Sequence, residues 1–409
     1  MKKVFLVTKL STTNLGNQAL SMELIKLFSS NIGKENLYVC GRPLGLYAYD
    51  MEALIASTEP DKLFDKWADA AVKKFRSQHS HASFKPGIET FKLTRVSTTK
   101  YEGIKVILRP LKRMLKRFSV YDKTYTPRIA NINSCDVLIY SGAGEVTDNH
   151  VFLRQLLEIR IAQKLGKQTG AVNQSLVITT EPFKKIVKLV YGNMNQIVVR
   201  GAISKTNITA FGVDSNKIIT APDTAIRTIA APGGVRKKGT VGINITPVPV
   251  INYEWKDVEA IVNKLREYNK EIVFVTNEPH GDISVQEKFK ASFNIDALGE
   301  AKDYMEYAMQ LSAFDYVISA RLHTNVMALS VSVPVIPIEG RMFKTKELFQ
   351  LFEYPLPTVN VDNTEWAQSV IDSIDLIERG TIDFPAYFKN VLVKHKEEVK
   401  YNVSWVNNN

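Results

Sequence analysis

An arginine and a histidine stand two positions apart in VISARLHTNVMALSVSVPVIPIEG, residues 317–340. The apolar run before them predicts a buried strand that ends near Arg321 and His323. If the strand continues through both residues, their side chains point to the same side and can reach one ligand. Arginine binds phosphate or carboxylate with a planar fork of donors, and histidine can transfer a proton near neutral pH. The pair suits an anionic substrate whose reaction needs a proton. The competing interpretation is an arginine bonded to backbone carbonyls and a histidine that caps the following helix.

Polar residues and glycines follow most of the other predicted strands, which is where open parallel sheets bind ligands. In the first half of the chain these residues are Asn14, Gly16, Asn17, Ser141, Gly142, Gly144, Glu145, Gln174, Ser175, Arg200 and Asp223. In the second half they are Asn244, residues 277–280, Glu339 and Arg341. Glycine turns allow backbone N–H groups to approach an anion at the N-terminus of a helix. Asp223 is expected to hold Arg227 or the backbone of a linker, with a catalytic role as the alternative. His280 is expected in a flexible turn, either as an exposed loop residue or, because the turn follows a strand end, as part of the site.

Neither a familiar nucleotide-binding motif nor a metal-binding motif is complete in the sequence. The glycine turn SGAGEVTD, residues 141–148, lacks the full GxGxxG pattern of dinucleotide-binding proteins, and no GxxxxGK[ST] motif occurs. No metal-ligand spacing is present, and the two cysteines, Cys40 and Cys135, are expected in the core. We therefore expect no metal ion and disfavour a nucleotide-binding dehydrogenase.

Strands and helices alternate along the chain in the β-α-β order of a doubly wound parallel sheet. The strands of the first half are predicted at residues 3–8, 36–41, 135–144, 169–175, 196–201 and 217–223. The alternation then restarts, with strands predicted at residues 240–247, 270–279, 315–323 and 333–340. The predicted fold class is α/β, with two Rossmann-like doubly wound parallel-sheet domains that face a cleft.

Composition along the chain defines the expected domains. Residues 1–230 form an N-terminal Rossmann-like domain that carries a basic, poorly periodic insertion at about residues 42–130. The glycine- and proline-containing residues 231–239 form a linker, and residues 240–362 form a C-terminal Rossmann-like domain. A terminal helix and tail, residues 363–409, could cross back to the N-terminal domain.

The chain is a basic protein of 409 residues, with 53 Lys and Arg against 42 Asp and Glu and a net charge of +11. This excess favours polyanions, anionic lipid surfaces or acidic substrates as partners. Residues 105–117 carry several basic residues in an amphipathic pattern. They predict either a surface helix with a solvated basic face or peripheral attachment to an anionic membrane. Because the sequence has neither a bilayer-spanning apolar run nor a signal peptide, we expect a cytoplasmic protein, bound at most to the inner face of the membrane.

Several of these segments resemble those of the polysaccharide pyruvyl transferases. In chain order, the similar blocks are NLGNQAL, DVLIYSGAGEVTD, NQS, VVRGAISKTNI, APDTA and ISARLHTNVMALSVSVPVIPI, of which the last is the most specific. The resemblance implies a two-domain enzyme with the architecture of GT-B glycosyltransferases. Such an enzyme moves a pyruvyl group from phosphoenolpyruvate onto two sugar hydroxyls as a ketal. The implied acceptor is a glycan or lipid-linked oligosaccharide of a cell-surface polysaccharide, with no cofactor and no nucleic-acid partner.

The resemblance also implies roles for individual residues. His323 resembles the family's general acid and Arg321 an arginine that binds the anionic donor, so these two are the predicted catalytic residues. The predicted substrate-binding residues are Arg200, Asn14, Gly16, Asn17, Gly142, Gly144, Glu145, Gln174, Ser175, Asn277, His280, Leu322, Glu339 and Lys344. The chain departs from the family pattern at Gln18 and Ala19, where an acidic residue is usual, and at residues 141–144, where SGAG replaces consecutive glycines.

Two other functions fit the same residues. A GT-B glycosyltransferase would use Arg321 and Lys344 to bind the diphosphate of a nucleotide sugar, and Glu339 to hold its ribose. A glycan-binding module without activity would bind neither phosphoenolpyruvate nor a nucleotide sugar. The response of the protein to each donor distinguishes the three functions.

Overall fold

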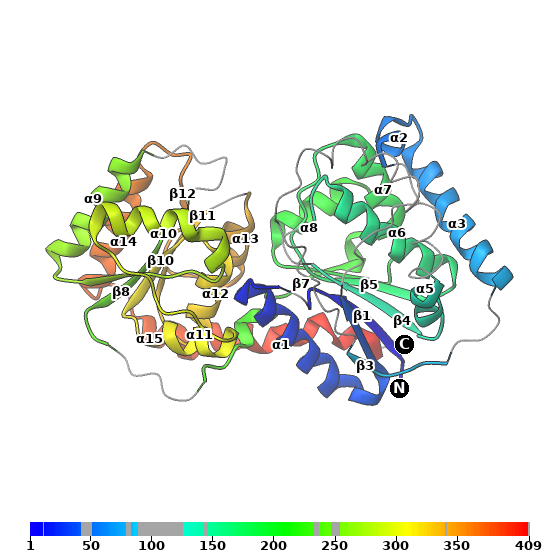
Figure 1. Cartoon of the computed structure of the whole chain (residues 1–409), viewed down its shortest axis with the longest axis horizontal. Helices are drawn as coiled ribbons and strands as arrows, with labels where there is room; N and C mark the ends of the chain where they lie inside the picture. Colours follow the sequence, from blue (N-terminus) through cyan, green and yellow to red (C-terminus); the bar gives the residue numbers. More distant parts are fainter. Residues whose placement is uncertain are drawn as a thin grey trace, which may run out of the picture.

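Two parallel β-sheets organise the chain (Figure 1). The computed structural model describes residues 1–10, 12–41, 51–78, 83–88, 126–142, 146–231, 237–246, 254–339 and 342–407. The predicted basic segment at residues 105–117 lies outside this described part, as do the predicted site residues Gly144 and Glu145. The expectation of two Rossmann-like parallel-sheet domains is confirmed.

The first sheet has seven strands in the order β3-β2-β1-β4-β5-β6-β7, all paired in parallel. Its strands are β1 (Val4–Thr8), β2 (Leu37–Gly41), β3 (Gly87–Ile88), β4 (Val137–Ser141), β5 (Gln168–Gln174), β6 (Gln196–Val199) and β7 (Ile218–Thr220). Its helices are α1 (Leu15–Ile32), α2 (Met51–Ala56), α3 (Pro60–Gln78), α5 (Thr126–Asn133), α6 (His150–Lys164), α7 (Glu181–Gly192) and α8 (Ala202–Ala210). The strand order reverses beside β1, so a ligand crevice is expected at the carboxyl ends of β1 and β4, where α1 begins.

The second sheet has five strands in the order β12-β11-β10-β8-β9, again in parallel. Its strands are β8 (Thr240–Asn244), β9 (Glu271–Phe274), β10 (Tyr316–Ser319), β11 (Val335–Glu339) and β12 (Val359–Asn360). Its helices are α9 (Trp255–Glu267), α10 (Pro279–Phe293), α11 (Tyr304–Leu311), α12 (Leu322–Ser330), α13 (Lys344–Leu351) and α14 (Trp366–Glu378). In this sheet the strand order reverses between β8 and β10. Strand β10 leads directly into the segment of Arg321 and His323.

The alternation of side chains along β1 builds two of the three hydrophobic cores. Val4 and Leu6 belong to the core that lies between the two halves of the chain and also contains Val326 of α12. Phe5 and Val7 point to the opposite face of the first sheet and pack in a second core. A third core covers the far face of the second sheet. The core between the halves therefore holds α1 and α12 together, and the site lies where these two helices begin.

The last part of the chain returns to the first sheet (Figure 1). It contains α15 (Phe384–Tyr387) and α16 (Val393–Glu398), joined by the π-helical turn η5 (Phe388–Leu392) and followed by the 3-10 turns η6 (Val399–Asn402) and η7 (Ser404–Asn407). The Asn402 Nδ2 donates to Pro222 O at 3.3 Å, and the Trp405 ring lies against Gly170 of β5. None of the helices in the described ranges is long and apolar enough to cross a membrane.

Candidate active site between the two sheets

The turn between β10 and α12 separates the side chains of Arg321 and His323. The strand ends at Ser319, Arg321 is the N-cap of α12, and His323 is the second residue of that helix. The same-side geometry of a continued strand is therefore not found, because a helix begins within the segment. The two side chains reach different neighbours in consequence.

His323 lies against the first turn of α1, which belongs to the other half of the chain. A Cβ atom on Gly16 would lie 2.1 Å from the Cβ of His323 and 2.6 Å from its Nδ1, so only glycine allows this contact. The His323 side chain is 12% exposed, and its Nε2 lies 3.6 Å from the Oδ2 of Asp223. This buried nitrogen has no hydrogen-bond partner among the residues that the structure describes.

Asp223 and Arg200 form a buried ion pair beside His323. The Arg200 Nη1 donates to Asp223 Oδ2 at 2.7 Å, and the Arg200 Nε donates to the Ser175 hydroxyl at 3.0 Å. Burial raises the pKa of the Asp223 carboxyl, but His323 and the charge of Arg200 lower it more, so its pKa lies well below the ordinary value. Asp223 is thus ionised at neutral pH. The expectation that it holds Arg227 or the linker is wrong, because β6 and β7 bring Arg200 to it.

Glu347 of α13 extends this network across the two halves, and sequence reasoning missed it. Its buried carboxylate accepts hydrogen bonds from the hydroxyls of Ser175 and Ser204 and, at 3.0 Å, from the backbone N–H of Ser204. The N-cap of α8 is Gly201, which has no side chain to cap the helix. Glu347 supplies that cap from the second half of the chain.

Arg321 is bound by two carboxylates of α10 and its N-cap. Its guanidinium makes a bidentate pair with Asp282, which is fully buried, and its Nη1 donates to Glu278 Oε2 at 3.2 Å. Asp282 also accepts a hydrogen bond from Asn244 at 3.2 Å. The Arg321 side chain is 25% exposed, and that of Glu278 is 38% exposed. The outer side of the guanidinium therefore contacts a carboxylate that solvent can reach.

Asn14 and Asn277 join the starts of α1 and α12. The Asn277 Nδ2 donates to Asn14 Oδ1 at 2.9 Å, and Leu15 N donates to Asn277 O at 2.8 Å. Thr324, the neighbour of His323, donates from its hydroxyl to Asn277 Oδ1 at 3.0 Å. The Asn14 side chain also caps α1 by accepting from Asn17 N. These contacts fix the position of His323 against Gly16.

The structure brings some of the predicted site residues together and leaves others apart. Gly16, Ser175, Arg200 and His323 form one cluster, with Asn14, Asn17 and Asn277 next to it. Gln174 is buried, and it donates to Val172 O while it accepts from the Tyr191 hydroxyl. Gly142 packs against the backbone of Asn173, and Leu322 packs against the core between the halves.

Glu339 and Lys344 lie at the start of α13. The two oxygens of Glu339 accept from Thr345 N at 3.2 Å and Lys346 N at 2.7 Å. Burial raises the pKa of Glu339 to about 7, although these N–H donors lower it. Lys344 is the first residue of α13. The carboxylate of Glu339 is thus occupied within the chain.

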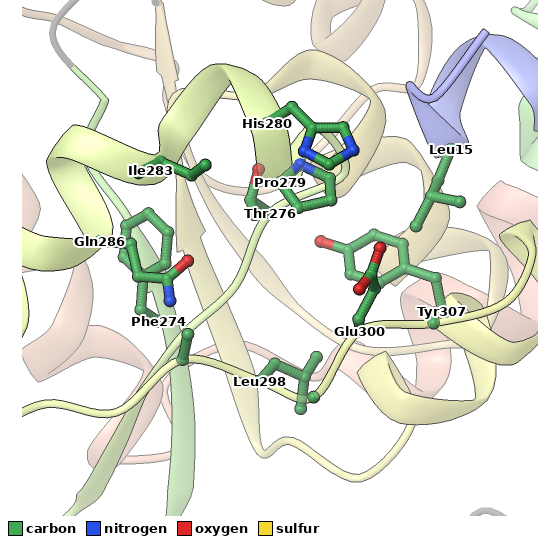
Figure 2. Close-up of a pocket in the computed structure, with 13 residues that line it drawn as sticks. Leu15, Phe274, Thr276, Pro279, His280, Ile283, Gln286, Leu298, Glu300 and Tyr307 are labelled. Atoms are coloured by element: carbon green, nitrogen blue, oxygen red, sulfur yellow. The ribbon is translucent and has the colours of Figure 1, made fainter.

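His280 lies in the first turn of α10, on the rim of a cavity of about 330 Å³ that Figure 2 shows. The cavity is formed by the end of β9, α10, the segment 297–301 and the residues Leu15 and Tyr307. No group of three His, Cys, Asp or Glu side chains that could hold a metal ion is found in the described ranges.

A two-domain GT-B-like enzyme is the class that this fold and interdomain site define. Residues 14–340 match the sequence model of the polysaccharide pyruvyl transferase family, so the chain belongs to that family and is a transferase. The family acts in polysaccharide biosynthesis, and the chain is assigned to that process as a member of the family. No curated protein matches the chain.

Solved structures with the same fold span nearly the whole chain at low sequence identity. HepE from Anabaena in complex with UDP has a TM-score of 0.56 and 12% identity, over 100% of this chain and 99% of that one. The UDP-GlcNAc 2-epimerase of Neisseria meningitidis bound to UDP-GlcNAc has a TM-score of 0.52 and 11% identity, over 99% of this chain and 100% of that one. The UDP-GlcNAc 2-epimerase of Methanocaldococcus jannaschii has a TM-score of 0.53 and 14% sequence identity, over 99% of this chain and 99% of that one. These likenesses show the GT-B-like fold.

Proposed function

We propose that the protein transfers a pyruvyl group from phosphoenolpyruvate to two hydroxyls of a sugar in a cell-surface glycan or its lipid-linked precursor. One observation carries the proposal within the family. The Nε2 of His323 is buried, lacks a hydrogen-bond partner among the described residues, and faces the ionised Asp223 at 3.6 Å. A histidine in this position can give up a proton and take it back, because the carboxylate balances the charge of its protonated form.

The reaction needs one proton donor and a site for two anionic groups. His323 gives a proton to the methylene carbon of phosphoenolpyruvate, and the adjacent carbon becomes an oxocarbenium-like centre. A sugar hydroxyl attacks that carbon and releases its proton, and the second hydroxyl closes the ketal as phosphate leaves. The proton of the first hydroxyl returns to His323 and replaces the one given to the new methyl group, and the proton of the second hydroxyl leaves with the phosphate.

Arg321 is the donor-binding arginine in this proposal. Its guanidinium contacts the buried Asp282 on the inner side and the exposed Glu278 on the outer side. An incoming phosphate or carboxylate takes the place of Glu278 and keeps the inner pair intact. A Glu278→Gln protein should therefore show a lower KM for phosphoenolpyruvate.

Phosphate release in the presence of phosphoenolpyruvate and a panel of glycan acceptors tests the function. The wild type should release phosphate and increase the acceptor mass by one pyruvyl group. His323→Asn should lower kcat by about 10²- to 10⁴-fold. His150→Asn is the matched control, because His150 is an exposed residue at the start of α6. Equal turnover by His323→Asn and the wild type would disprove the proton-donor role.

Glycosyl transfer from a nucleotide sugar is the second candidate, because HepE in complex with UDP shares the fold. Against it, both carboxylate oxygens of Glu339 already accept backbone N–H groups of α13 and are not free to hold a ribose. Release of UDP from a UDP-sugar, with no response to phosphoenolpyruvate, would favour the glycosyltransferase.

A further inference from the structure

The cavity beside α10 has the lining of a sugar-binding pocket (Figure 2). Its volume of about 330 Å³ lies at the small end of the range of protein ligand pockets, which is roughly 300–1,000 Å³. We propose that it binds one sugar ring of the acceptor, an inference that rests on the proposed pyruvyl transfer. The neighbouring ring of the same glycan then extends toward His323.

Three polar side chains on the pocket have no partner of their own. His280, Gln286 and Glu300 make no hydrogen bond or ion pair with another residue in the described part of the chain. Figure 2 shows them around the same space, His280 and Gln286 from α10 and Glu300 from the opposite segment. A ring of unpaired donors and acceptors suits a ligand with several hydroxyl groups.

Apolar side chains complete the lining between these polar groups. Ile283 is 48% exposed on this side of α10, and Leu298 faces it across the cavity (Figure 2). A pyranose ring has apolar C–H faces and a polar edge, so it can pack on Ile283 and Leu298 while its hydroxyls reach Gln286 and Glu300. The lining therefore matches both parts of a sugar ring.

The pocket offers the anionic donor no permanent cation. Among the thirteen residues that line it, Glu300 is an acid and neither Lys nor Arg occurs. Phosphoenolpyruvate would meet a carboxylate here without a lysine or arginine to balance its own charges, whereas a neutral sugar needs no such partner. The two substrates of the proposed reaction thus have separate places, the donor beside Arg321 and the acceptor in the pocket.

Two contacts connect the pocket to the catalytic cluster. Leu15 lines the pocket and directly precedes Gly16, which contacts His323. The hydroxyl of Tyr307, another lining residue, lies 3.1 Å from the Thr324 hydroxyl, next to His323 in α12. A glycan that fills the pocket with one ring is therefore held within reach of the proton donor.

Saturation-transfer NMR with the full-length protein tests this inference without turnover. The probes are methyl glycosides of common hexoses and N-acetylhexosamines, with uridine as a competitor. At least one glycoside should give a signal with the wild type and lose it in Leu298→Trp, which fills the pocket. Leu376→Trp is the matched control, because Leu376 is exposed on α14, away from the pocket. Gln286→Leu, which removes polar atoms and no volume, should also weaken the signal.

Kinetics separate this inference from the proposed function. With a working acceptor, Leu298→Trp should raise the KM for the acceptor about tenfold or more and leave the KM for phosphoenolpyruvate unchanged. If the wild type turns over and the variant changes neither the acceptor KM nor the NMR signal, the pocket assignment is wrong and the function stands. If glycosides bind in a Leu298-dependent way but phosphoenolpyruvate is not used, the function is wrong and the pocket stands. Absence of any glycoside signal, or its displacement by uridine, overturns the sugar assignment.

Discussion

The imidazole Nε2 of His323 lies 3.6 Å from the carboxylate Oδ2 of Asp223, although the two residues follow strands of different sheets. The same oxygen accepts a hydrogen bond from Arg200 at 2.7 Å. Asp223 is therefore shared between a permanently charged guanidinium and an imidazole that can gain or lose a proton. Its low pKa keeps it ionised through such a proton transfer.

Removal of the Asp223 charge should damage both turnover and stability. Asp223→Asn leaves Arg200 buried without an ionic partner, which costs about 3–5 kcal/mol. It also removes the charge that balances protonated His323, so kcat should fall by about 10²-fold. Urea unfolding and steady-state kinetics measure the two effects. Asp372→Asn, at an exposed position of α14, is the control. Wild-type kcat in Asp223→Asn would show that His323 acts without its neighbour.

A methyl group at residue 16 should displace His323 and loosen the contact between α1 and α12. Gly16 lies within the first turn of α1, where alanine is favoured over glycine by about 1 kcal/mol. Its Cβ would, however, lie 2.1 Å from that of His323. Because neither Cβ can rotate away, the start of α1 or of α12 must shift, so Gly16→Ala should lose most of its turnover and be less stable than the wild type by about 1–3 kcal/mol. Gly192→Ala is the matched control, because a Cβ there meets no atom within 4 Å. Full activity of Gly16→Ala would mean that the fixed position of His323 is unimportant.

The sequence predicts the two sheets because strand, turn and helix signals are local. It also predicts that Gly16, Ser175, Arg200 and His323 serve one site, since each follows the carboxyl end of a strand. The direction of Arg321 is not predictable in the same way. A helix begins at Leu322, where the sequence suggested a continued strand, and the Arg321 side chain therefore pairs with Asp282 of α10.

Glu347 shows where sequence reasoning fails for a different reason. In the sequence it is an acidic residue in the first turn of a helix, a position that ordinary surface helices share. Its partner Ser204 is 143 positions away, and the contact exists only because the two halves meet. A contact between domains leaves no periodic signal in either segment.

The cross-domain cap made by Glu347 predicts a coupling between closure of the two halves and catalysis. Glu347→Ala should leave the N-terminus of α8 uncapped, at a cost of about 0.5–2 kcal/mol, and free Ser175 from its position beside Arg200. We expect a lower kcat and, in solution X-ray scattering, a larger radius of gyration. Glu287→Ala, on the exposed face of α10, is the control. An unchanged radius and an unchanged kcat would show that the cap does not hold the halves together.

The raised pKa of Glu339 predicts a specific pH dependence of stability. Burial raises this pKa from 4.5 to about 7, so between these values the folded protein binds more protons than the unfolded chain. The contribution of Glu339 to the free energy of unfolding is therefore fully present below about pH 4.5 and is lost as the pH rises through about 7. Glu339→Gln removes the titration, so its stability relative to the wild type should rise with pH, by at most about 3 kcal/mol, and then level off. Urea unfolding of both proteins between about pH 5 and about pH 8 measures the difference, in which the titration of all other groups cancels. A difference that stays constant across this range, or decreases, would show that Glu339 is ionised at the start of α13 throughout.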